Sequence, residues 1–202
     1  MKIERKNTPL DKIKRVMYIG ERYWDIIRYD IPRFLKNLWM FRKDIYNYHW
    51  YSGKHAVLPF MKTALMDMAA KIDERGMEVE PSKSKKVMKM WRAAKLMEHF
   101  IEENFIELAE QELGEMTLHD LEFEDAPDHP GYYQLVDNET PEEKVHNRNV
   151  FARAHEIEES MWAELWDILK GQDSTEIKSL PETDEKSFDK WFDGSGLRGW
   201  WD

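Results

Sequence analysis

Apolar side chains recur at every third or fourth position along most of this chain, which is the spacing of an α-helix with one apolar face. The last such stripe has the clearest start, because Thr140, Pro141 and Glu143 form a capping box with proline at the first helical position. Gly76 and Gly171 each follow a stripe and are typical of helix ends. We therefore expect a mainly all-α fold, a bundle of about five helices over residues 9–27, 31–41, 52 or 55 to 75, 82 or 84 to 113, and 141–170.

Two of these helices carry features that a plain bundle does not explain. Asp30 and Pro32 are expected to end the first helix and to restart the chain as the second, which should be amphipathic with one buried face. The fourth predicted helix is basic in its first half and acidic in its second half. Because that order opposes the helix dipole, a neighbouring segment of complementary charge would explain it.

The remaining segments lack a helical period. Residues 115–140 contain Pro127, Pro130 and Gly131 and predict a long loop, within which a short β-hairpin at residues 121–135 is one option. Residues 172–187 are polar and predict a linker. The aromatic residues beyond it are expected to dock, which divides the chain into a helical domain at 1–171 and a linker with a docking aromatic tail at 172–202; these residues are Phe188, Trp191, Phe192, Trp200 and Trp201.

The charges of the chain are strongly segregated. Residues 1–95 hold 22 Lys and Arg and 11 Asp and Glu, whereas residues 96–143 hold 16 Asp and Glu and no Lys or Arg. One interpretation is that acidic and basic segments face each other in the fold. The other is a basic pocket or face for an anion, with an acidic face elsewhere.

Several classes of protein lose their support at this level. The chain has no Cys, which excludes disulfides, zinc ribbons and thiolate nucleophiles. The glycine-rich, serine and histidine motifs of P-loop enzymes, Rossmann oxidoreductases, α/β-hydrolases and zinc proteases are missing. No apolar run reaches the length of a membrane span and no signal peptide is evident, so we expect no membrane association and a cytoplasmic location.

Two clusters are candidates for a binding site. The first lies at residues 44–55, where aromatic rings could stack on a ligand and histidines could contact phosphate or transfer protons; its members are Asp44, Tyr48, His49, Trp50, Lys54 and His55. The second combines Arg148 with His155, whose neighbour Glu159 lies one helical turn away. The alternative interpretation is structural in both cases, an aromatic corner between helices and a satisfied histidine at the edge of the core.

A metal site receives little support from the spacing of possible ligands. Di-iron helical bundles use two Glu-x-x-His motifs, and this chain has one, Glu143-x-x-His146, in a position that capping already explains. We therefore predict no metal site and name no cofactor.

Three stretches of the chain resemble a family of uncharacterised proteins from tailed bacteriophages. They are Trp39 to His55 with the helix that follows from Leu58 to Ile72, the stretch with Asn149, Ala152, Arg153 and His155, and the terminal Trp200-Trp201-Asp202. The resemblance implies a small accessory protein made inside the infected cell. Such proteins commonly inhibit host enzymes or defence systems, and some bind or destroy nucleotide signals.

Taken together, the sequence favours a binding or inhibitory protein that acts in the host cytoplasm and captures a small anionic, nucleotide-like ligand. One alternative is a metal-dependent or His-dependent hydrolase of phosphate esters, so whether the protein is an enzyme stays open. A second is a protein–protein inhibitor that uses the acidic face at residues 96–143. Nucleic acid is disfavoured as a partner because the total charge is negative, and self-association is left open.

Overall fold

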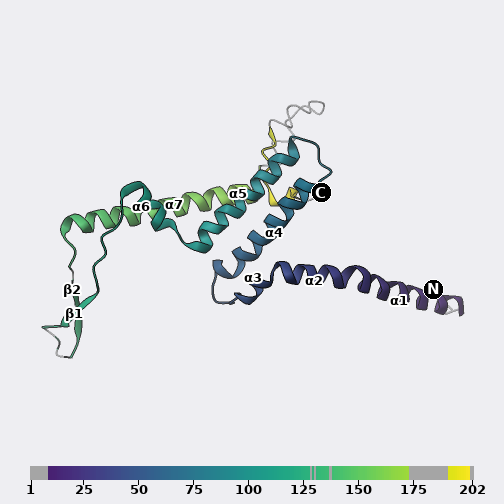
Figure 1. Ribbon diagram of the computed structural model, residues 1–202, viewed down its shortest axis with the longest axis horizontal. Coiled ribbons are helices and arrows are strands. Elements are labelled where there is room, and N and C mark those ends of the chain that lie inside the picture. Colours follow the sequence, from purple (N-terminus) through teal and green to yellow (C-terminus); the bar gives the residue numbers. More distant parts are fainter. Residues whose placement is uncertain (1–8, 128, 130, 137, 173–190, 201–202) are drawn as a thin grey trace, which may run out of the picture. The chain divides into compact units, whose positions relative to one another are not determined.

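The computed structural model describes residues 9–127, 129, 131–136, 138–172 and 191–200, with side chains from Met17 onward (Figure 1). The chain divides into two compact units, unit 1 at Met1–His49 and unit 2 at Trp50–Asp202. Each unit is described by itself. The domain boundary predicted after residue 171 stays a prediction.

Unit 1 is helical over almost its whole described length. It consists of α1 (Pro9–Asp25), a π-helical turn (Ile26–Asp30), α2 (Ile31–Met40) and α3 (Arg42–Tyr46). The predicted interruption at Asp30 is therefore a change of helix type and not a loop. The Ile31 amide donates to the carbonyl of Ile26, five residues back, and Pro32, which has no amide proton to donate, follows at once in the first turn of α2.

The apolar face of α2 is present but it is not buried. Its stripe consists of Ile31, Phe34, Leu35 and Leu38, and all four side chains are exposed. Between Met17 and Tyr46, the part of unit 1 whose side chains are described, no residue is buried. The prediction that this face of α2 is buried is therefore wrong for the described residues.

Unit 2 contains α4 (Lys54–Arg75), α5 (Ser82–Glu102), α6 (Phe105–Leu113), β1 (Glu122–Asp125), β2 (Tyr133–Val136), α7 (Pro141–Lys170) and a 3₁₀ turn (Leu197–Gly199). The helix α4 packs along α5, and both α5 and α6 pack on α7. Met90, Met97 and Phe100 of α5 are fully buried and belong to one core cluster with Val150 and Leu165 of α7. The mainly all-α prediction is confirmed, and so is the short antiparallel hairpin.

The prediction of one continuous fourth helix is wrong, because the structure has two helices there, α5 and α6. The helix α5 ends at Glu102, and the chain passes through Glu103 in the left-handed conformation (φ +53°) before α6 begins at Phe105. The Asn104 side chain lies 2.9 Å from Nδ1 of His99, which fixes the corner. The apolar stripe gave no sign of this break because both halves use the same period.

Ion pairs between helices account for much of the unusual charge order in α5. Arg92 donates to both carboxylate oxygens of Glu164 on α7, each at 2.6 Å. On the other side Lys62 of α4 contacts Glu98 at 2.5 Å. Arg92 and Glu98 of α5 therefore each meet an opposite charge on a neighbouring helix, in place of a favourable helix dipole.

The fifth predicted helix has the ends that its sequence indicates. Thr140 accepts a hydrogen bond from the amide of Glu143, and the Glu143 carboxylate accepts one from the amide of Thr140, so both parts of the capping box are present. Gly171 ends α7, as predicted.

Within unit 2, the C-terminal segment packs on the helices through Trp200. Its side chain is 1% exposed and its indole nitrogen donates to the carbonyl of Gly194 at 2.7 Å. Lys85 donates to the carbonyl of Phe192, and Lys89 pairs with Asp193 at 3.1 Å. Phe188, Trp201 and most of the predicted linker lie outside the described residues.

Candidate functional site

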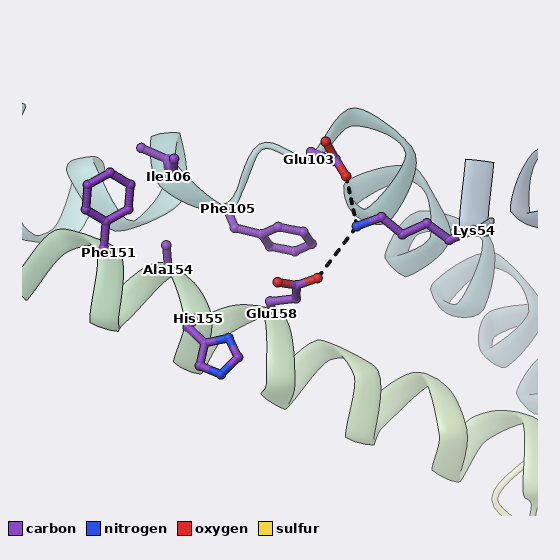
Figure 2. Close-up of a pocket in the computed structure, with 8 residues that line it drawn as sticks. All are labelled: Lys54, Glu103, Phe105, Ile106, Phe151, Ala154, His155 and Glu158. Atoms are coloured by element: carbon purple, nitrogen blue, oxygen red, sulfur yellow. Dashed lines mark ion pairs between the residues drawn. The ribbon is translucent and has the colours of Figure 1, made fainter. Parts of the chain in front are cut away.

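The corner between α5 and α6 forms one wall of a pocket in unit 2 (Figure 2). The pocket has a volume of about 270 Å³. The first turn of α4 contributes a second wall and the middle of α7 a third. The lining residues are Lys54, Glu103, Phe105, Ile106, Phe151, Ala154, His155 and Glu158.

The position of Lys54 follows from the glycine before it. Gly53 has φ +53°, a conformation that favours glycine, and it lets the chain turn directly into α4. Lys54 is the first residue of that helix, and its Nζ lies 3.0 Å from Oε1 of Glu103 and 3.6 Å from Oε1 of Glu158. One ammonium thus connects the start of α4 with the end of α5 and the middle of α7 (Figure 2).

Glu103 receives a second contact from the neighbouring residue on α4. Nε2 of His55 lies 3.1 Å from the same carboxylate oxygen that Lys54 contacts. The hydrogen bond from Lys54, together with that from His55, holds the pKa of the Glu103 carboxyl below its usual range. Glu103 is therefore the common acceptor of the group.

The apolar part of the pocket rests on aromatic packing. Phe105 is buried, and its ring centroid lies 5.4 Å from that of Phe100, which stacks at 4.0 Å on Trp162. Phe151, by contrast, is exposed at the mouth of the pocket. The pocket consequently offers ring surface on one side and a cluster of charges on the other.

The structure brings together two of the residues predicted from sequence. Lys54 from the first cluster and His155 from the second both line this pocket, and His55 contacts its wall through Glu103. Arg148 lies exposed on α7 but is not one of the lining residues.

The other predicted residues lie elsewhere. Asp44, Tyr48 and His49 belong to unit 1. Trp50 begins unit 2, where its largely exposed ring meets Tyr51 edge to face at 5.7 Å.

Sequence reasoning missed most of the pocket. The predicted face of α7 contained His155 and Glu159, whereas the pocket uses the face rotated by one residue, with Phe151 and Glu158. The four-residue spacing of Phe151 and His155 was the signal that could have found it. Glu103 and Phe105 carried no signal of their own, because their place depends on the corner between α5 and α6.

No protein-family model, curated protein or solved structure matches this chain. Within the described ranges, no three His, Asp or Glu side chains are grouped so as to hold a metal ion. In the part of the chain that the structure covers, none of the helices combines the length and apolar character that crossing a bilayer requires.

Proposed function

We propose that this protein is a binding protein that captures a small nucleotide-like ligand in the pocket around Lys54 and His155. The observation that carries this proposal is the convergence of these two residues. They come from the two clusters that the sequence singles out independently, and both line the pocket that also contains the rings of Phe105 and Phe151.

The charges of the pocket restrict the class of ligand. Lys54 is already paired with Glu103 and Glu158, so a bare phosphate would have to displace a carboxylate and would meet a second one. A heterocyclic base suits the same groups better, because its N–H groups can donate to Glu158 while its ring packs on Phe151. The phosphate of a nucleotide would then lie outside the pocket, near the ammonium group of Lys54.

The size of the pocket limits the ligand further. Pockets for drug-sized molecules usually hold roughly 300–1,000 Å³, and this one lies just below that range. It accommodates one ring system and not a dinucleotide. The resemblance to tailed-phage proteins supports an accessory role in the infected cell, where capture of a nucleotide signal would be inhibitory.

Isothermal titration calorimetry with adenosine, AMP and inorganic phosphate tests this proposal. We expect the nucleoside and the nucleotide to bind and inorganic phosphate not to. Glu158→Gln should weaken binding by about tenfold, because it removes a charged acceptor for the ligand. Glu159→Gln is the matched control, since this neighbour is exposed and does not line the pocket; equal affinity of both variants, or no binding of any nucleoside, would contradict the proposal.

A further inference from the structure

Unit 1 exposes an unusually large amount of apolar surface. We call residues 17–46 the arm. Twelve of its large apolar side chains are between 43% and 68% exposed; they are Met17, Tyr18, Ile19, Tyr23, Trp24, Ile27, Tyr29, Ile31, Phe34, Leu35, Leu38 and Trp39. A patch of this extent on a folded protein usually marks a contact surface.

The arm has the form of a helix that docks. On α2 the residues Ile31, Phe34, Leu35 and Leu38 follow the spacing of one helical face. Beside α1, a hollow of about 390 Å³ is lined by Tyr18, Ile19, Arg22, Tyr23 and Ile26, and can receive side chains of a partner. An isolated helix of this kind gains little stability in water, so cover for its apolar face is the main stabilisation available to it.

The charge of unit 1 indicates the kind of surface that covers the arm. Residues 1–49 hold 12 Lys and Arg and six Asp and Glu, a net charge of +6, so residues 50–202 carry −16 of the total of −10. Pairing two arms with each other would bring together like charges. An acidic surface with exposed apolar side chains is complementary.

Unit 2 contains such a surface in its hairpin. The strands β1 and β2 place Phe123 opposite Leu135 and Asp125 opposite Tyr133, all on one face, and the three apolar side chains are more than half exposed. Residues 115–140 hold eight Asp and Glu and no Lys or Arg. A two-stranded sheet is marginally stable alone, so it also gains from a helix packed on its open face.

We propose that the arm of one copy docks on the hairpin face of a second copy, so that the protein self-associates through opposite charges and through the apolar face of each element. Phe34 and Leu38 would contact Phe123 and Leu135. This inference does not depend on the ligand pocket, and its test reports on association alone.

The absence of Cys makes a direct test available. Full-length Leu38→Cys protein is mixed with full-length Phe123→Cys protein and treated with a short bismaleimide. Each chain carries one thiol, so an arm–hairpin cross-link joins two copies. We expect a heterodimer yield on the order of tenfold above that of the control Asn37→Cys, which lies beside Leu38 but off the apolar stripe, because docked thiols have a high effective concentration.

Sedimentation velocity of the full chain gives the second readout. We expect a dimer or larger assembly that dissociates in Leu38→Glu and persists in Asn37→Glu, which adds the same charge off the apolar stripe. Raising the salt concentration should weaken the association, since screening removes attraction between opposite charges, whereas an arm–arm contact would strengthen.

Three results would overturn the proposal: a monomer at all concentrations, cross-links confined to Leu38→Cys homodimers, or equal yields with Leu38→Cys and Asn37→Cys. If the protein is a monomer and floats with anionic phosphatidylglycerol vesicles, the arm binds a lipid surface and not a second copy. Glu124→Lys changes the charge of the hairpin and leaves Phe123 and Leu135 in place. Repeating the sedimentation experiment with this variant therefore tests the contribution of charge alone.

Discussion

At the scale of single residues, the group around Glu103 fixes geometry more than it adds stability. The side chains of Lys54 and Glu103 are partly exposed, and ion pairs of this kind contribute on the order of 0.5 kcal/mol each. Their effect is to hold a left-handed residue at the α5–α6 corner. Since that corner forms a wall of the pocket, modest energies there decide whether the site exists.

The lowered pKa of Glu103 predicts a pH dependence for this group. A carboxyl whose pKa is depressed in the folded state contributes stability above its unfolded pKa of about 4.3, and the contribution is lost as pH falls through the lower folded value. Glu103→Gln should therefore lower the free energy of unfolding by roughly 0.5–1 kcal/mol at pH 7, after allowance for solvent screening.

Urea denaturation of the wild type and the variant at pH 7 and pH 3 measures that difference. We expect it to shrink toward zero at the lower pH. Glu107→Gln, an exposed substitution on α6, should show no such convergence. A difference that is the same at both pH values would mean that the ionised form of Glu103 is not what stabilises the corner.

At the scale of elements, local signals were readable from the sequence and distant ones were not. The capping box at Thr140 lies within four consecutive residues, so the start of α7 was predicted to the residue. The contacts that the break at Glu103 makes with the rest of the pocket come from Lys54 and His55, and His55 lies 48 residues away along the chain. Both halves of the broken helix keep the same apolar period, so the period alone reveals neither the interruption nor the pocket beside it.

The position of the C-terminal segment also depends on a contact with a distant part of the chain, here a close approach between two backbones. Gly194 has φ +87°, and a Cβ added there would lie 2.3 Å from the carbonyl carbon of Lys85. Gly194→Ala should therefore detach this segment and cost at least ~2 kcal/mol of unfolding free energy. Gly199→Ala is the control, because no atom lies within 4 Å of its added Cβ.

Hydrogen exchange is the appropriate measurement for Gly194→Ala. The indole N–H of Trp200 is buried and bonded to the carbonyl of Gly194, and should exchange much faster in this variant than in Gly199→Ala. If the indole stays protected in both variants, the segment is held by contacts other than the approach of Gly194 to α5.

At the scale of the whole molecule, the two units differ in kind. The core cluster, from Leu58 to Trp200, lies entirely within unit 2, whereas unit 1 buries none of its described side chains. Because burial of apolar area supplies most of folding stability, unit 2 should fold without unit 1. The described side chains of unit 1 then contribute nothing to the core.

A truncated chain that begins at Trp50 tests this division. We expect a cooperative thermal transition within about 4 °C of that of the full chain, compared at concentrations low enough to separate copies, because no core side chain is lost. Removing residues 191–202 instead should lower the midpoint by more, since Trp200 leaves the core and a cavity costs roughly 3–5 kcal/mol. If the chain from Trp50 melts without cooperativity, unit 1 must cover part of unit 2 in the same molecule, and the arm would then be unavailable to a second copy.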